Sequence, residues 1–238
     1  MYKIRVKFTK TELMKFISHL DLLRLMERAM RRADIPLAFS QGFNPHPKIS
    51  FATATAIGLS SEGEYMDIEV EEQIDLEEVK DKMNRNLPAG IRILQCKLVP
   101  VKIDALMATV DYSTYITKIE LSQEHNDKDH QKCLQDFLEQ REILIQKISK
   151  KKNKQESKEV DIRPWIFDFQ LLNEEKNVLI YKMTLATGSR GNLKPEMLIE
   201  KFCEFVPLSI KSDKTRIHRL DLYSLVNGKL ISPIDATA

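Results

Sequence analysis

The stretch ISHLDLLRLMERAMRRADIPLAFSQGFNPHPKISF, from Ile17 to Phe51, decides how this 238-residue chain folds. It joins an amphipathic helix, expected to start at an N-cap near Thr11 and to end before Pro36, to a loop stiffened by further prolines. The periodicity predicts a buried helical stripe that consists of Leu13, Phe16, Ile17, Leu20, Leu23, Met26, Met30 and Ala33.

The segments on either side of this stretch read as strands and a second helix. Before it, apolar and basic residues alternate from Lys3 to Phe8, which is the period of a half-buried strand. After the loop, the pattern predicts two strands, a helix capped by its first Asp, and a last strand, at 48–56, 64–70, 75–86 and 91–98. Charges on the first strand, Lys3, Arg5 and Lys7, are expected to face Tyr65, Asp67 and Glu69 on an antiparallel neighbour.

The rest of the chain repeats the order strand, helix, strand, strand, helix, strand. The expected elements are 111–121, 127–149, 160–172, 178–187, 195–205 and 216–225. We therefore predict an α+β protein with two tandem ferredoxin-like (βαββαβ) domains, each an antiparallel sheet with helices on one face. The predicted domains are 1–100 and 110–226, with a tail at 227–238. The lysine-rich segment 147–158 is expected to be a solvated loop or a frayed helix end.

Composition narrows the class of protein. The chain is 42% hydrophobic and 30% charged, with a formal net charge of +2, so any nucleic-acid binding must come from local clusters. No apolar run approaches the ~18 residues of a membrane helix, and the N-terminus resembles no signal peptide, so we expect a cytoplasmic protein without membrane contact. Cys96, Cys133 and Cys203 are far apart and the histidines form no ligand pattern, so we expect buried thiols, no metal and no cofactor.

The helix within Ile17–Phe51 carries four arginines in nine residues, Arg24, Arg28, Arg31 and Arg32. They share an arc about 100° wide, and the nearby acids Asp21 and Glu27 are too few to neutralise them. Two interpretations remain open. The arc is either an ordinary solvated face or a face that binds anions such as phosphates.

The loop Ser40–Ser50 is the second candidate. Asn44 and His46 each precede a proline, which restricts their backbone to extended geometry. Such a loop presents four polar side chains at low entropic cost, namely Gln41, Asn44, His46 and Lys48. It is either a recognition surface or a rigid connection that aims the next strand.

Three further features are weaker. His19, His46 and Lys48 are candidate catalytic residues, as general bases or as a charge stabiliser. The alternative for His19 is a half-buried histidine satisfied by a backbone carbonyl, because lone histidines on apolar helix faces are usually structural. Thr187–Pro195 opens a helix with two glycines, so Ser189, Arg190 and Lys194 could form an anion nest. The alternative there is a glycine turn with an Asn cap.

The motifs SHLD and SQGFNPHPKISFA, together with GSRGNLKPE and IHRLDLY, resemble the radical SAM-linked protein family, in which this domain occurs alone or fused to a radical SAM enzyme. The resemblance covers most of the chain and implies a radical SAM enzyme as functional partner. The chain itself lacks the CxxxCxxC cluster motif. More loosely, the predicted fold with a histidine in its first helix is similar to RAMP-type CRISPR RNA-processing endoribonucleases. Here, however, the glycines at Gly188 and Gly191 precede the last helix instead of following it.

We therefore expect an accessory protein, more an adaptor than an enzyme, that binds RNA or presents a substrate beside a radical SAM enzyme. The alternatives are a metal-independent endoribonuclease and a module that only docks the radical SAM partner.

Overall fold

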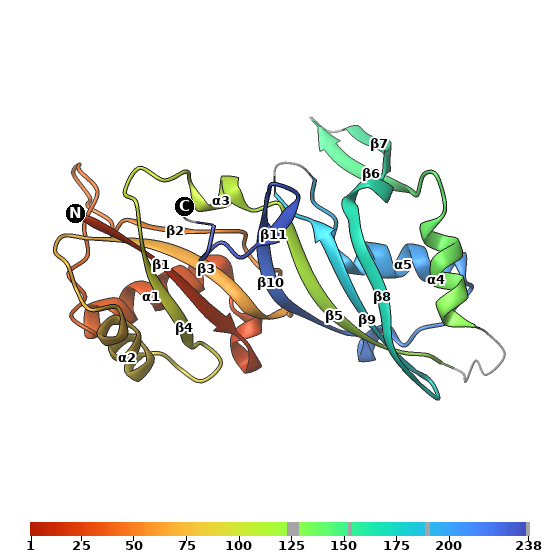
Figure 1. Cartoon of the computed structure of the whole chain (residues 1–238), viewed down its shortest axis with the longest axis horizontal. Coiled ribbons are helices and arrows are strands. Elements are labelled where there is room, and N and C mark those ends of the chain that lie inside the picture. Colours follow the sequence, from red (N-terminus) through yellow and green to blue (C-terminus); the bar gives the residue numbers. More distant parts are fainter. Residues whose placement is uncertain (123–128, 152–153, 189–190, 237–238) are drawn as a thin grey trace. The chain divides into compact units, whose positions relative to one another are not determined.

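The computed structural model describes residues 1–122, 129–151, 154–188 and 191–236 (Figure 1). The chain divides into two compact units: unit 1 comprises Met1–Ser113 and His218–Ala238, and unit 2 comprises Thr114–Ile217. The predicted α+β class is confirmed, because mostly antiparallel strands and helices build the structure. The division differs from the expected ranges 1–100 and 110–226, because the chain returns to unit 1 at its end.

Strand β1 (Tyr2–Lys10) lies in the middle of the unit 1 sheet. It pairs antiparallel with β3 (Ser60–Val70) on one side and with β4 (Ile93–Val99) on the other. The short strand β2 (Ile49–Phe51) pairs antiparallel with β3. Near the start of β3, β10 (Arg216–Val226) pairs with it in parallel, and β11 (Lys229–Ile231) pairs antiparallel with β10. Residues expected to be a tail therefore include a strand.

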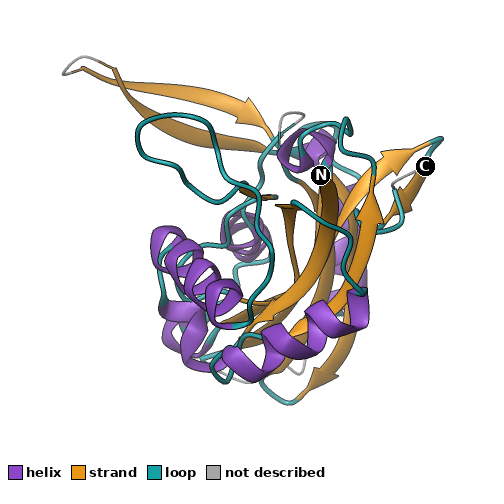
Figure 2. Cartoon of the chain, turned by 90° about the vertical axis from the view of Figure 1, so that its left-hand side faces the viewer, coloured by secondary structure: helices purple, strands orange, loops and turns teal. Residues whose placement is uncertain are grey.

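Two helices cover one face of this sheet, α1 (His19–Arg32) and α2 (Leu76–Asn86) (Figure 2). Ile4, Val6 and Phe8 of β1 are fully buried beneath them, as the alternation predicts. The Asp75 cap is also confirmed, since its carboxylate accepts a hydrogen bond from the Glu78 amide at 2.9 Å.

The first helix starts later than predicted. A 3-10 turn, η1 (Glu12–Phe16), comes first, extended Ile17 interrupts it, and Ser18 then caps α1 by accepting a hydrogen bond from the Asp21 amide at 3.2 Å. This break resets the helical phase, so the stripe was wrong in its first half: Leu13, Phe16 and Leu20 are exposed. The second half of the stripe is confirmed at Met26, Met30 and Ala33, all buried.

The other face of the unit 1 sheet holds buried charges. The predicted register is confirmed, with Lys3 opposite Glu69, Arg5 opposite Asp67 and Lys7 opposite Tyr65. The Arg5 side chain is only 1% exposed; its Nε and Nη2 donate to the Asp67 carboxylate at 2.8 and 2.9 Å, and its Nη1 donates to the Pro233 carbonyl at 2.8 Å. The C-terminal segment therefore covers this face.

A second buried pair lies nearby, where the Arg219 guanidinium donates to the Glu64 carboxylate. Burial lowers the pKa of the neighbouring Lys10 ammonium, which the Glu64 charge partly opposes. A small apolar cluster completes this side and consists of Ala52, Tyr65, Leu106, Val110, Leu222 and Ile234. Leu106 belongs to a single helical turn, α3 (Leu106–Thr109). Polar groups here bond one another and apolar groups fill the remainder, so Arg5, Glu64 and Asp67 are all buried.

Unit 2 is built on β5 (Tyr112–Glu120), β9 (Val178–Ala186) and β8 (Ile166–Glu175), which neighbour one another in that order. Its helices are α4 (His130–Leu138) and α5 (Pro195–Phe205). Their aromatic side chains form the core with those of the strands, mostly edge to face: Phe137, Phe169, Tyr181 and Phe202.

The predicted helix 127–149 was wrong beyond Leu138. The chain instead forms a separate two-stranded sheet of β6 (Leu144–Lys151) and β7 (Lys154–Asp161). The described residues of 147–158 are therefore strands and not a loop or a frayed helix end, and 152–153 lie outside the described residues. In a helix, the lysines of this segment would stack on one another at i, i+3 and i, i+4, which is unfavourable. The predicted strand 160–172 is likewise interrupted by a 3-10 turn, η2 (Arg163–Trp165). A further 3-10 turn, η3 (Ser212–Lys214), precedes β10.

Of the three cysteines expected to be buried, Cys203 is buried, whereas Cys96 and Cys133 are half-buried. Burial raises the pKa of the Cys96 thiol to about 12 and that of Cys203 to about 11. In the part of the chain that the structure describes, no helix has both the length and the apolar character to cross a bilayer.

The Arg5–Asp67 pair gives a first testable prediction. Asp67→Ala leaves the Arg5 guanidinium buried without its carboxylate, so we expect the free energy of unfolding, measured by urea denaturation, to fall by about 3–5 kcal/mol. The control is Glu77→Ala, which removes an exposed carboxylate bonded to Lys80 and should cost less than about 1 kcal/mol. Equal losses in the two variants would contradict this assignment of the buried pair.

Candidate functional site

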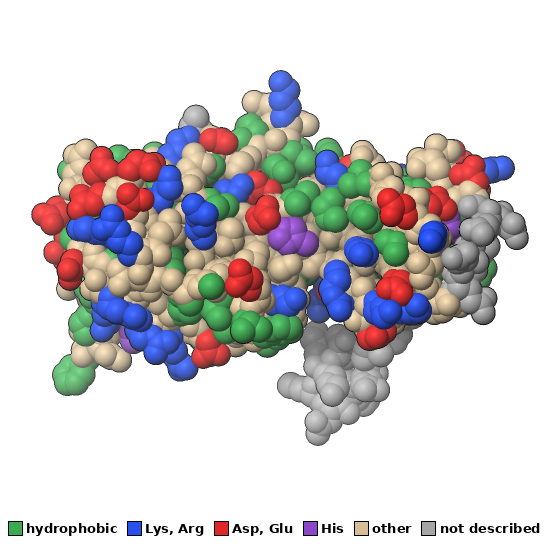
Figure 3. Space-filling model, turned by 90° about the horizontal axis from the view of Figure 1, so that it is seen from below, with side chains coloured by type: hydrophobic (Ala, Val, Ile, Leu, Met, Phe, Trp, Pro, Cys, Tyr) green, Lys and Arg blue, Asp and Glu red, His purple; other side chains and the backbone are tan. Residues whose placement is uncertain are grey.

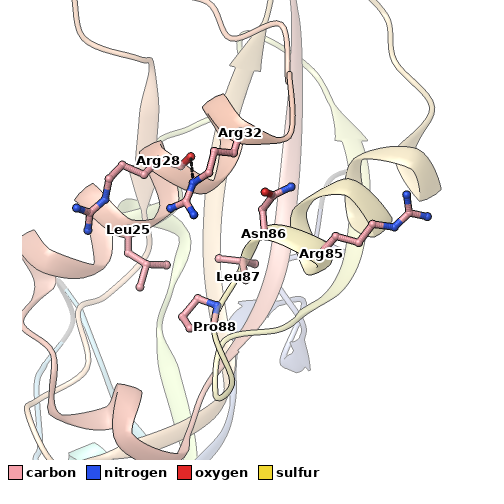
Figure 4. A pocket seen from close by; sticks show the side chains of 7 residues that line it. All are labelled: Leu25, Arg28, Arg32, Arg85, Asn86, Leu87 and Pro88. Atoms are coloured by element: carbon pink, nitrogen blue, oxygen red, sulfur yellow. Dashed lines mark hydrogen bonds between the residues drawn. The ribbon is translucent and has the colours of Figure 1, made fainter.

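A hollow of about 380 Å³ lies between the outer sides of α1 and α2 in unit 1 (Figure 4). Its lining combines three arginines, an amide and three apolar side chains: Arg28, Arg32, Arg85, Asn86, Leu25, Leu87 and Pro88. The two helices bring these residues together because both bury their opposite sides against the same sheet face.

The three arginines of the hollow are exposed and lack an acidic partner. Arg32 Nε donates to the Arg28 carbonyl at 3.3 Å, which holds its side chain along α1, and Figure 4 shows its guanidinium reaching toward the space between the helices. Among the described residues, no carboxylate oxygen lies within 4 Å of the guanidinium groups of Arg28, Arg32 or Arg85. Guanidinium groups are always charged and bind planar or tetrahedral anions through paired N–H donors. The hollow can therefore bind an anion, with apolar contacts beside it.

The structure separates the four predicted arginines into two pairs. Arg28 and Arg32 line the hollow, whereas Arg24 and Arg31 are exposed elsewhere on α1. Arg24 Nη1 is 3.7 Å from the Asp21 carboxylate, an exposed pair that contributes little energy. Figure 3 shows groups of lysine and arginine side chains at the left of the molecule, the end that unit 1 occupies in Figure 1.

Sequence reasoning missed Arg85, which lies in the last turn of α2. The sequence did contain a signal for Arg85. In a predicted βαββαβ unit the two helices cover the same face of the sheet, so a basic residue at the end of the second helix is expected to lie near the first helix.

The loop Gln41–His46 is exposed along its whole length and closed at its base. The Ser40 amide donates to the His46 carbonyl at 2.9 Å, and the His46 amide donates to Ser40 Oγ at 3.0 Å. Below this clasp, Pro47 is buried and bridges to Phe39. The loop is therefore a compact hairpin-like projection, with Gln41, Asn44 and His46 at its surface.

Phe43 at the tip of this loop is the second residue that sequence reasoning missed. Its side chain is fully exposed, at 110% of the reference area. Its neighbours along the chain are Gly42, which has a φ of +133°, and Asn44, whose amide nitrogen lies 3.4 Å from His46 Nε2. An aromatic residue flanked by Gly and Asn in a polar loop was the signal available in the sequence.

The candidate catalytic residues do not share a site. Lys48 Nζ is bound to the Glu69 carboxylate at 3.0 Å, so its charge is matched. His19 is the exposed first residue of α1 and its ring rests edge-on against Phe51 at 5.2 Å, so the half-buried histidine interpretation was wrong. Within the described ranges, neither His19 nor His46 has a carboxylate within 4 Å to orient it.

One imidazole does contact a hydroxyl and an acid. The parallel pairing of β3 and β10 places His218 Nδ1 2.9 Å from Ser60 Oγ, with His218 Nε2 3.6 Å from a Glu62 carboxylate oxygen. Ser60 and His218 are 158 positions apart, so their spacing in the sequence could not predict this contact. Glu62 is largely exposed, and the three groups act as a polar link between the two strands.

The predicted nest in unit 2 is only partly described, because Ser189 and Arg190 lie outside the described residues. Lys194 is exposed and occupies the N-cap position of α5, so the expected Asn cap was wrong. Among the described residues, no three His, Cys, Asp or Glu side chains lie together in a way that could hold a metal ion.

Residues 3–195 match the family DUF2344, which is described as an uncharacterized protein conserved in bacteria. Because the match spans most of the chain, this protein belongs to that family. The family description names no radical SAM enzyme. Comparison with curated proteins found no match.

Three solved structures show a distant likeness. The first is a Cbf5–Nop10–Gar1 complex, with a TM-score of 0.49 and 8% identity over 92% of this chain and 48% of that chain. An archaeal box H/ACA sRNP Nop10–Cbf5 complex follows at 0.46 and 6%, over 91% and 46%. An H/ACA RNP bound to a substrate RNA containing 2′-deoxyuridine gives 0.44 and 7%, also over 91% and 46%. This chain spans about half the length of the chains it matches, and the likeness is too distant to assign a function.

The clasp at the base of the loop gives a second prediction. Ser40→Ala removes the oxygen that accepts the His46 amide, a bond worth about 1 kcal/mol, so the loop should open about five-fold more often. We expect chymotrypsin to cleave after Phe43 faster by that factor under native conditions. Ser50→Ala, an exposed serine outside the clasp, is the control, and equal cleavage in both variants would contradict the role of Ser40.

Proposed function

We propose that this protein is a noncatalytic accessory that binds structured RNA through the arginine side of unit 1. The observation that carries the proposal is the set of three guanidinium groups, Arg28, Arg32 and Arg85, around one hollow with no carboxylate within 4 Å in the described chain. Solvated surface arginines are commonly paired with acids at helical spacings, as Arg24 is with Asp21. In Figure 4 the Arg32 guanidinium reaches toward the space between the helices, and those of Arg28 and Arg85 point to either side of it. Three unmatched cations along one hollow in this way are suited to an extended ligand with several negative charges.

Phosphate groups of nucleic acids meet this requirement. Arginine presents two parallel N–H donors to phosphate oxygens, and each phosphate neutralised releases condensed counterions. The net charge of +2 provides little attraction at long range, so binding depends on this local cluster. Structured RNA offers phosphates on a rigid frame, to which two fixed helices are complementary.

Other predicted residues extend the proposed surface. Arg24 and Arg31 lie on α1 beside the hollow-lining pair, and Gln41, Asn44 and His46 are exposed on the loop. Lys48 is not part of the proposed surface, because the Glu69 carboxylate neutralises its charge. In unit 2, the anion nest of Ser189, Arg190 and Lys194 stays a prediction.

The partnership with a radical SAM enzyme is also part of the proposal. Its support is the resemblance of the SHLD and SQGFNPHPKISFA motifs, which lie on α1 and the adjoining loop. A cytoplasmic adaptor that binds RNA beside such an enzyme would present a substrate to it. An endoribonuclease activity has weaker support, because His19, His46 and Lys48 each contact a different group.

The scaffold we propose is a pair of ferredoxin-like units. In unit 1 the strand order β4-β1-β3, with β2 beside β3 and two helices on one face, supports this assignment. In unit 2 the support is the order β5-β9-β8 together with α4 and α5.

Charge reversal tests the proposed RNA binding. We expect the double variant Arg28→Glu, Arg32→Glu to bind a labelled pool of structured bacterial RNA about 100-fold more weakly, because each substitution removes a charge-assisted contact. The slope of log affinity against log salt should also shrink in magnitude by about 2. Fluorescence anisotropy over a range of salt concentrations measures both quantities.

The matched control is Arg92→Glu, Lys102→Glu, which makes the same charge change at exposed positions of unit 1 that do not line the hollow. It should bind RNA with nearly the wild-type affinity. Binding that is insensitive to salt, or equally weakened by both double variants, would remove the proposal.

A further inference from the structure

Phe43 stands out among the exposed apolar side chains of unit 1. Its ring is open to solvent on both faces, at 110% of the reference area. Phe16, exposed by 57%, differs because the Lys15 ammonium lies over its ring at 5.0 Å from the centroid. Phe43 therefore offers an unoccupied aromatic face, which gains nothing from the folded chain itself.

The backbone of the loop that carries this ring is restrained. Ser40 and His46 clasp the base through two hydrogen bonds, and Pro45 and Pro47 restrict the residues before them. Gly42 adopts a φ of +133°, a conformation that favours glycine and turns the chain at the tip. An aromatic side chain on a preorganised loop loses little freedom when it binds a partner.

The neighbours of Phe43 indicate what it contacts. Three of the exposed side chains beside it, Gln41, Asn44 and His46, are hydrogen-bonding groups, and Pro45 and the partly exposed Phe39 are the apolar ones. The centre of a protein-docking surface is usually more apolar than this. Aromatic faces flanked by polar donors and acceptors are the common means of holding unpaired bases, which stack on the ring and present their edges.

The loop is within reach of the arginine hollow. Ser40 follows Arg32 by eight positions in the sequence. Even a fully extended chain would therefore keep their Cα atoms within about 28 Å. One folded RNA element spans that distance easily.

We infer that Phe43 is a stacking platform for an unpaired RNA base, while the arginines of the hollow bind the phosphates of the same RNA. This inference rests on the proposed RNA binding and adds a preference for RNA with single-stranded loops over continuous duplex. The amide and imidazole groups of Asn44 and His46 lie where the edge of a stacked base could be read.

The test uses two synthetic probes, an RNA hairpin whose unpaired loop carries 2-aminopurine and a blunt duplex of the same stem sequence. We expect the wild-type protein to bind the hairpin more tightly and to quench the 2-aminopurine fluorescence by stacking. Phe43→Ala should weaken hairpin binding about 10-fold and abolish the quenching, while duplex binding changes by less than about two-fold. Phe43→Trp should retain both properties.

The control variant is Phe16→Ala, an exposed phenylalanine whose ring face is already covered, and it should behave as wild type. Tight RNA binding that Phe43→Ala leaves unchanged, or weakens equally for hairpin and duplex, would overturn this inference and leave the proposed function standing. Failure of the wild-type protein to bind either probe or the structured RNA pool would overturn both.

Discussion

The Arg5 side chain is the constraint on which unit 1 depends. It lies between the Asp67 carboxylate and the Pro233 carbonyl, so one buried guanidinium joins the first strand, the third strand and the end of the chain. A buried charge is tolerated only when its partners are in place, which makes this arrangement specific. The arginine hollow lies on the opposite side of this sheet, where α1 and α2 cover it.

The hydrophobic core of unit 1 sets the orientation of α1 and α2, and this orientation places their arginines on the outer sides of the helices. Met26 and Met30 of α1 and Met83 of α2 are buried against β1, and this orientation leaves Arg28, Arg32 and Arg85 on the opposite sides of their helices. The spacing between the helices, and hence the size of the hollow, follows from packing beneath it. The geometry of the hollow is therefore a product of the hydrophobic core beneath it.

Much of the fold could be predicted because its signals are local. Alternation in β1 gave both the buried face and the register of Arg5 opposite Asp67, since opposite charges across strands mark the pairing. The phase of α1 could not be predicted, because Thr11 and Ser18 are both plausible caps and only tertiary contacts decide between them. Likewise, the segment around Lys147 lacks a period strong enough to separate a helix from the strand β6.

The candidate site was harder to predict, since its members come from separate elements. Arg28 and Arg32 share a helix and were found together, whereas Arg85 is more than 50 residues away and joins them only through the fold. Phe43 was missed because exposure is a property of the folded loop.

The insertion of unit 2 within the sequence of unit 1 has a consequence for synthesis on the ribosome. Thr114–Ile217 emerges before His218, so unit 2 can fold while unit 1 still lacks β10, β11 and the Pro233 carbonyl. The Arg5 guanidinium therefore gains its full set of partners only after residue 233 has been translated.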